Sequence, residues 1–281
     1  MTGLSKPIEG VFSNTMAYVR WGDGSKTLLV IPGGPGNDLP SGRQVRMMMG
    51  RLLRPMVESG YSLWMVARRR GMPPGHTVED MAADYADLIT AEFDGKVDLV
   101  VGVSYGGIIG QYLAANYPNH FGHIVLVGAA YTVSEQGRRL DYDWATARSR
   151  GDWAGAGQIM VGAMLSDSWL RWSAPALGTV MGLMSRSHVH DQFASDVMVE
   201  ADAEVAFDAR PVLAQVKTPV LLINGDNDLY FPLPLIQETA RLIPDCTLKI
   251  YPGKGHPGVF QSRQLAPDIL DFITTKPPAA T

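Results

Sequence analysis

The sequence predicts an α/β fold, in which a mostly parallel central β-sheet is flanked by helices and carries a helical cap insertion. Short apolar segments alternate along the chain with helical patterns, which is the order of elements in a parallel α/β sheet. The apolar segments are continuous runs, as expected for strands covered on both faces. One stretch, residues 131–211, shows helical patterns but no convincing strand, and it predicts the insertion.

Seven apolar segments are predicted to be strands. An Asp-Gly pair, Asp23-Gly24, separates the first two and favours a hairpin between them. Most later segments are joined by helical patterns, which favours right-handed crossovers between parallel strands. The predicted strands are 17–21, 28–31, 62–67, 97–103, 124–127, 220–223 and 247–251.

Helical patterns occupy the connections between these strands. Thr77 can cap a helix, and Asp80 lies three residues later, where a capping box has its acidic or amide partner. Met81, Tyr85 and Leu88 then recur on one helical face. Further helical patterns lie at 108–116, 236–243 and 259–273, the last with Pro267 inside it.

The segment 131–211 is predicted to be a cap or lid packed over one edge of the sheet. Residues 1–130 and 212–281 then form the core. The cap holds four of the 6 tryptophans and five of the 14 methionines, and ordinary helix packing accounts for many of them. The candidates for lining a substrate pocket are Trp144, Trp153, Met160 and Met164.

The composition excludes several classes of protein. The chain has 281 residues, of which 46% are hydrophobic and 19% charged, as in globular proteins. A net charge of −4 without a long basic run predicts no nucleic-acid partner. The single cysteine, Cys246, excludes an internal disulfide and a multi-cysteine metal site. With no visible signal peptide and no apolar run of about 18 residues, we expect a soluble cytoplasmic monomer or homodimer.

The strongest chemical signal is a G-x-S-x-G motif with Ser104 at its centre. It follows the apolar strand 97–103 and precedes a helical pattern. A serine on such a tight strand-to-helix turn presents its hydroxyl above the sheet, and the helix N-terminus beneath it favours negative charge. The motif therefore predicts Ser104 as a nucleophile.

A serine nucleophile needs a base and a carboxylate that orients the base. Among the 6 histidines, only His256 follows the last predicted strand, in a loop turned by glycines and prolines. His188 and His190 form the rival pair, but residues at i, i+2 of a presumed helix point to different faces, which argues against a shared metal. Asp226 and Asp228 both follow the preceding strand, and both qualify as the acid.

From about residue 15 to residue 273, the chain resembles the α/β-hydrolase fold superfamily. In that superfamily the nucleophile, the acid and the histidine follow one another in the same chain order as here. Its acid lies in a G-x-x-D pattern followed by a proline. Gly225 to Asp228, with Pro232 beyond, matches this pattern and favours Asp228 over Asp226.

A Pro-Gly-Gly-Pro-Gly segment at 32–36 is the candidate oxyanion loop. Proline has no backbone N–H, so only the glycines can donate. The segment resembles the H-G-G-P-G segment of the superfamily, in which the residue before the proline donates. The resemblance implies that Gly34 is one donor and that the N–H of Tyr105, after the nucleophile, is the other.

Two positions depart from the superfamily pattern. Pro32 stands where a histidine is common, and Arg68 stands where the D-x-R-G turn has its aspartate. The arginine run 68–70 could meet an acidic substrate. Pairing with local carboxylates, or exposure to solvent, is the expectation for it.

These residues predict a serine hydrolase that cleaves a small to medium hydrophobic ester through an acyl-enzyme, without metal or cofactor. Its expected partner is a small-molecule substrate. Ser104 argues against the epoxide hydrolase and haloalkane dehalogenase branches, which usually have aspartate there. Proline iminopeptidases share the glycine loop, but their serine and arginine motifs differ. Five alternative functions stay open: a lactonase, an amidase, a carbon–carbon bond hydrolase, a perhydrolase side activity and a non-catalytic binding protein of the same fold.

Overall fold

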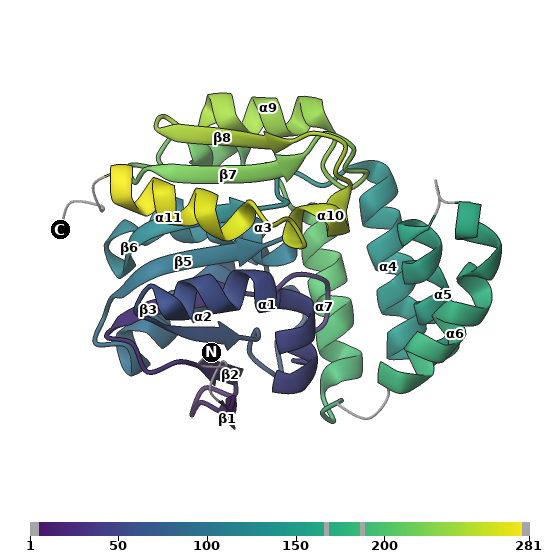
Figure 1. The fold of residues 1–281 in the computed structure, drawn as a ribbon. Coiled ribbons are helices and arrows are strands. Elements are labelled where there is room, and N and C mark those ends of the chain that lie inside the picture. Colours follow the sequence, from purple (N-terminus) through teal and green to yellow (C-terminus); the bar gives the residue numbers. More distant parts are fainter. Residues whose placement is uncertain (1–5, 166–168, 186–188, 277–281) are drawn as a thin grey trace.

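The computed structural model describes residues 6–165, 169–185 and 189–276 (Figure 1). Its eight strands form one sheet in the order β1-β2-β4-β3-β5-β6-β7-β8. Strands β3 to β8 run parallel to one another, and β2 runs antiparallel to both of its neighbours, β1 and β4. The predicted mostly parallel sheet is therefore confirmed. The strands are β1 (Ile8–Val11), β2 (Ala17–Trp21), β3 (Lys26–Ile31), β4 (Tyr61–Val66), β5 (Val97–Val103), β6 (Phe121–Val127), β7 (Val220–Gly225) and β8 (Cys246–Tyr251).

The predicted hairpin between β2 and β3 is wrong. Both edges of β3 are taken by parallel partners, with Leu28 opposite Leu63 of β4 and Leu99 of β5. Strand β2 instead pairs antiparallel with β4 on one side and with β1 on the other. The buried β3 therefore lies in the middle of the sheet, and the hairpin joins β1 to β2.

Helices cover both faces of the sheet, and each face has its own hydrophobic core. Helices α1 and α11 cover one core, whereas α2, α3 and α9 cover the other. The predicted capping box at Thr77 and Asp80 is present at the start of α2. These elements are α1 (Gly42–Glu58), α2 (Val78–Glu92), α3 (Tyr105–Asn116), η1 (Pro118–His120), α8 (Arg210–Leu213), α9 (Leu233–Leu242), α10 (His256–Phe260) and α11 (Leu265–Thr275).

The pattern at 259–273 forms parts of two helices rather than one. The break falls between Phe260 and Leu265, and Pro267 lies in the first turn of α11. Proline is tolerated there because the first N–H groups of a helix have no partner within it. Helix α10 begins at His256, after the turn 252–255 that follows β8.

A run of helices separates β6 from β7, and the described part of this run contains no strand. Figure 1 shows α4 and α7 beside the carboxyl ends of the strands, with α5 and α6 farther from the sheet. Nowhere in the ranges described above is a helix both long and apolar enough to cross a membrane. The helices of this insertion are α4 (Glu135–Ser149), α5 (Trp153–Met164), η2 (Trp169–Ser173), α6 (Ala174–Met184) and α7 (Phe193–Ala206).

Candidate active site

Ser104 occupies a strained turn between β5 and α3. Its backbone has φ 53° and ψ −114°. The positive φ lies in the left-handed range, which residues other than glycine rarely adopt. A Cβ atom added to Gly102 would collide with the Gly106 carbonyl oxygen, and one added to Gly106 would collide with that of Ile31. The glycines of the motif thus let the turn pack against its neighbours, while the serine carries the strain.

Three side chains from separate parts of the chain meet at this turn. The Nε2 atom of His256 lies 2.8 Å from the Ser104 hydroxyl oxygen. Its Nδ1 atom lies 2.7 Å from a carboxylate oxygen of Asp228. The structure therefore brings the predicted serine, histidine and aspartate together, in that order, within hydrogen-bond distance.

Asp228 and Asp226 have different roles in the loop after β7. Asp228 is buried, and its second oxygen accepts hydrogen bonds from the backbone N–H groups of Tyr230 (2.9 Å) and Phe231 (3.2 Å). Asp226 is exposed and accepts from the N–H of Gly253 at 2.6 Å, which ties the turns after β7 and β8 together. Only Asp228 is bonded to the imidazole, as the G-x-x-D pattern predicts.

Aromatic rings surround the imidazole of His256. The ring centroids of Tyr230, Phe231 and Phe260 lie 4.8, 5.6 and 5.1 Å from that of the imidazole. The histidine side chain is only 12% exposed. This packing restricts the orientation of the ring and keeps most water away from it.

The glycine loop after β3 passes directly against the serine. A Cβ atom built on Gly33 would lie 2.7 Å from Cβ of Ser104, so only glycine fits there. Gly34 has φ 75°, and among the described residues its N–H has no hydrogen-bond partner. The N–H of Gly34 is therefore free to donate to a bound molecule, as the resemblance implies. Tyr105, the other implied donor, begins α3.

The residues of the helical insertion that are predicted to line a pocket separate into two groups. Trp144 and Trp153 surround the guanidinium of Arg148, with ring centroids 4.9 and 4.2 Å from it. Burial lowers the pKa of Arg148 to about 10. Met160 and Met164 are 39% and 52% exposed. All four stay predictions as substrate contacts, and the tryptophans are the better enclosed pair.

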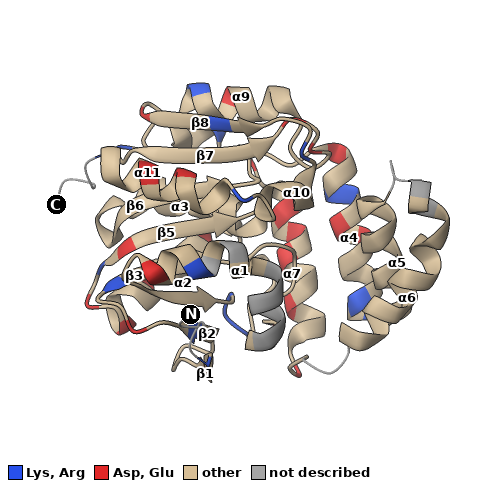
Figure 2. Ribbon diagram, in the orientation of Figure 1, with Lys and Arg blue, Asp and Glu red and all other residues tan. Residues whose placement is uncertain are grey.

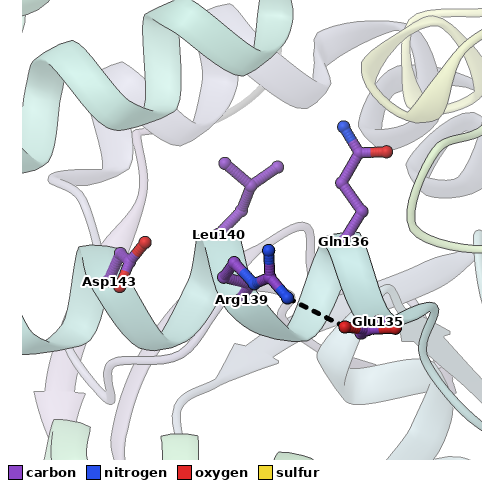
Figure 3. Close-up of a pocket in the computed structure, with 5 residues that line it drawn as sticks. All are labelled: Glu135, Gln136, Arg139, Leu140 and Asp143. Atoms are coloured by element: carbon purple, nitrogen blue, oxygen red, sulfur yellow. Dashed lines mark hydrogen bonds and ion pairs between the residues drawn. The ribbon is translucent and has the colours of Figure 1, made fainter.

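The remaining candidates make no hydrogen bond to Ser104, His256 or Asp228 within the part of the chain that the structure describes. His188 falls outside the described residues, and His190 lies before α7 rather than in a helix, with Nε2 2.8 Å from Asn37 Oδ1. The described ranges hold no group of three potential metal ligands. A pocket lined by residues of α4 contains none of the three converging residues, and its charged pair Glu135 and Arg139 is exposed (Figure 3). Its lining residues are Glu135, Gln136, Arg139, Leu140 and Asp143.

Three carboxylates on α7 were missed by the sequence analysis. Asp196, Glu200 and Glu204 are all buried and lie at i, i+4 and i+8, which places them on one face of the helix. Acids that recur every four residues are a signal in the sequence that could have revealed them. Asp196 accepts from the backbone N–H groups of Gly71 and Met72, both at 2.9 Å.

Glu204 approaches a second carboxylate near the imidazole. Burial raises the pKa of Glu204 well above its usual value, and the neighbouring Asp141 raises it further. Burial likewise raises the pKa of Asp141 to about 6, and Asp141 accepts from the Tyr230 hydroxyl at 3.1 Å. These two carboxyl groups therefore share a site in which at most one ionises easily.

Two of the three arginines after β4 pair with carboxylates. Arg68 is buried against Glu200, at 2.6 Å, and Arg69 pairs with Asp84 at 3.2 Å. Carboxylates therefore bind Arg68 and Arg69, but the partner of Arg68 is distant in the sequence.

The mostly parallel sheet with helices on both faces defines an α/β fold of the hydrolase type. The chain belongs to the α/β hydrolase fold family, whose profile matches residues 26–262.

Individual relatives are distant. "Putative carbamate hydrolase RutD" of Yersinia enterocolitica is 26% identical over 190 residues, which cover 66% of this chain and 66% of that protein. A pimeloyl-acyl-carrier-protein methyl ester esterase of Chromobacterium violaceum is 28% identical over 182 residues, or 61% of this chain and 67% of the relative. The enol-lactonase from Burkholderia xenovorans LB400 has a similar crystal structure, with a TM-score of 0.69 at 19% identity over 92% of this chain and 96% of that one. At this identity the structural likeness concerns the fold alone.

Proposed function

We propose that the protein is a serine hydrolase that cleaves carboxylic esters of small to medium hydrophobic substrates through an acyl-enzyme. The observation that carries the proposal is the series of hydrogen bonds from Ser104 through His256 to Asp228, at 2.8 and 2.7 Å. A strained serine at a helix N-terminus, an oriented imidazole and a buried carboxylate are the groups that acyl transfer needs. The esterase among the relatives supports the same chemistry.

The proposed reaction has two halves. His256 takes the proton of the Ser104 hydroxyl as the serine oxygen attacks the carbonyl carbon, and Asp228 stabilises the resulting imidazolium. The N–H groups of Gly34 and Tyr105 receive the oxyanion. When the intermediate collapses, the imidazolium returns its proton to the departing alcohol. Water then attacks the acyl-enzyme by the same route and releases the acid and free Ser104.

We further propose that residues 131–211 form a cap that closes the substrate site. An atom built on Gly36 of the glycine loop would lie 3.1 Å from Phe193 and 3.5 Å from Trp144, so side chains of α7 and α4 reach the loop. Aromatic walls of this kind favour a hydrophobic acyl or alcohol group.

Carbamates, lactones, amides and carbon–carbon bonds next to a carbonyl are cleaved by the same set of groups. The name of the Yersinia relative refers to a carbamate, and that of the Burkholderia structure to a lactone. Because the same catalytic groups suit each of these substrate classes, comparing hydrolysis rates is what distinguishes an ester substrate from the others.

A panel of p-nitrophenyl esters of increasing acyl length, with a carbamate, a lactone and an anilide, tests the proposal. We expect the highest kcat/KM for an ester with a medium acyl chain, and loss of about 10⁶ in kcat in Ser104→Ala. Activity in Ser104→Ala equal to that of the wild type would contradict the role of Ser104 as the nucleophile. If a carbamate or a lactone is hydrolysed with a higher kcat/KM than every ester, that compound class replaces esters as the proposed substrate.

Asp228→Asn and Asp226→Asn form a matched pair that tests the acid. Asp228→Asn should lower kcat by about 10⁴, because an amide at this position holds the wrong imidazole tautomer in triad enzymes. Asp226→Asn should change it less than about tenfold, because that carboxylate only braces Gly253. The reverse ranking would transfer the acid's role to Asp226.

A further inference from the structure

A single buried guanidinium binds the candidate oxyanion loop through several carbonyl groups. Arg68 is 1% exposed. Its Nη1 donates to the carbonyl of Pro32 at 2.9 Å, and its Nη2 donates to those of Gly34 at 2.7 Å and Gly36 at 2.6 Å. Every second carbonyl of the loop therefore points toward Arg68.

These bonds fix the two peptide groups that flank the Gly33–Gly34 peptide. Because a peptide unit is planar, a held carbonyl fixes its whole plane. The Pro32–Gly33 and Gly34–Pro35 peptides are held in this way. The peptide between them carries the N–H of Gly34, and glycine alone would leave it free to rotate. Arg68 thus restricts the direction of the Gly34 N–H without touching it.

The partner of Arg68 comes from the helical insertion. Glu200 of α7 accepts from Nε of Arg68 at 2.6 Å and from Nη2 at 3.2 Å, and its Oε2 also accepts from the N–H of Gly36. Burial alone would lower the pKa of Arg68, but the adjacent Glu200 carboxylate raises it. The guanidinium therefore stays charged while it holds the loop.

The same pair contacts the second implied donor. The Tyr105 hydroxyl donates to the backbone carbonyl of Glu200 at 2.8 Å. The guanidinium of Arg68 lies 4.8 Å from the centroid of the Tyr105 ring, in the range of a cation–π contact. One ion pair therefore contacts both residues whose N–H groups would receive an oxyanion.

We propose that Arg68 and Glu200 are positioning residues, which hold the N–H groups of Gly34 and Tyr105 in the arrangement that stabilises the oxyanion. This inference rests on the proposed function. It also links the two departures from the superfamily pattern, because the carbonyl of Pro32 is one of the acceptors of Arg68. A helix of the insertion thereby takes part in organising the core's catalytic edge.

The test compares Arg68→Lys and Glu200→Gln with the matched control Arg69→Lys. Lysine keeps the charge but has three donors, against the five hydrogen bonds that Arg68 makes. For each variant we would measure kcat and KM for the best p-nitrophenyl ester. We would also measure inhibition constants for a trifluoromethyl ketone of the same acyl chain and for its ether analogue. The ketone forms an oxyanion on the serine, whereas the ether cannot.

We expect Arg68→Lys to lower kcat by about 10- to 100-fold and to weaken ketone binding by the same factor. KM and ether binding should change less than about twofold, because ground-state binding does not use the oxyanion donors. Glu200→Gln should show a smaller loss of the same kind, and Arg69→Lys none. A merely structural role would weaken the ketone and the ether alike.

Two results would overturn the inference, and they differ from each other. If the wild type hydrolyses esters but both variants bind the ketone within twofold of wild type, the positioning role is wrong and the proposed function stands. If the wild type neither hydrolyses esters nor binds the ketone, the proposed function fails and the positioning role falls with it. Circular dichroism checks folding, and Glu200→Gln decides alone if Arg68→Lys does not fold.

Discussion

Helices α7 and α6 belong to the same insertion but violate the usual distribution of polar and apolar residues in opposite directions. Helix α7 buries three carboxylates, Asp196, Glu200 and Glu204, toward the rest of the protein. Helix α6 has no charged residue (Figure 2). It exposes apolar side chains, such as Leu183 at 52% and Met184 at 68%. Buried acids are costly unless they are paired, whereas single exposed apolar residues cost little.

The difference follows from what each helix touches. Each of these three buried acids meets a group with which it can bond or share a proton: backbone N–H groups, Arg68 or Asp141. Helix α6 packs on α5 through glycines, and its outer side chains stay in contact with solvent. The inner helix is thus specified by polar partners, and the outer one by close backbone packing.

The largest expected effect is on α7. Glu200→Ala should lower the free energy of unfolding by about 3–5 kcal/mol, because it leaves the buried charge of Arg68 unpaired. Met184→Ala, at an exposed site of α6, should change it by less than about 0.5 kcal/mol. Urea denaturation measures both. A Glu200→Ala cost as small as that of Met184→Ala would remove the distinction between the two helices.

Packing between α5 and α6 should give the next largest effect. A Cβ atom on Gly157 would collide with the carbonyl oxygen of Gly178, so Gly157→Ala should cost about 1–3 kcal/mol. Gly162 of the same helix has no atom within 4 Å of such a Cβ. Gly162→Ala should be neutral, or stabilising by up to about 1 kcal/mol. Equal thermal shifts for the two variants would contradict close packing at the glycines.

The smallest predicted effect depends on pH. Because burial raises the pKa of Asp141 from about 3.8 to about 6, the folded protein binds this proton more tightly than the unfolded chain does. Its contribution to stability is full below about pH 4 and is lost as the pH rises through 6. At pH 8 the free energy of unfolding of Asp141→Asn should therefore be about 1–2 kcal/mol higher than that of the wild type.

The control for Asp141→Asn is Asp143→Asn, an exposed site on the same helix. The gain of Asp141→Asn should shrink toward zero at pH 4, and Asp143→Asn should show no such trend. A gain that is the same at pH 4 and pH 8 would show that ionisation of Asp141 is not its cause.

Local patterns predict the core of the fold well. Strand β5 matches its predicted bounds, because a continuous apolar run between turn residues has few alternatives. Ser104, Asp228 and His256 each follow a strand, so a parallel sheet brings them to one edge. The choice of Asp228 required the G-x-x-D pattern as well, because Asp226 follows the same strand.

Features set by distant partners escape such patterns. The neighbour of β2 depends on the order of the whole sheet, so Asp23-Gly24 misleads although its local chemistry favours a hairpin. Arg68 and Glu200 are 132 residues apart, and neither position by itself indicates the other. The four-residue β1 is an exposed edge strand without the apolar pattern of the others.

The central claim is that Ser104 is an activated nucleophile, and covalent labelling tests it most directly. The protein would be treated with a fluorophosphonate, and the modified peptide identified by mass spectrometry. The account predicts a single adduct on Ser104 that is absent in Ser104→Ala and forms far more slowly in His256→Gln. An unlabelled wild-type protein, or an adduct that persists in Ser104→Ala, would contradict it.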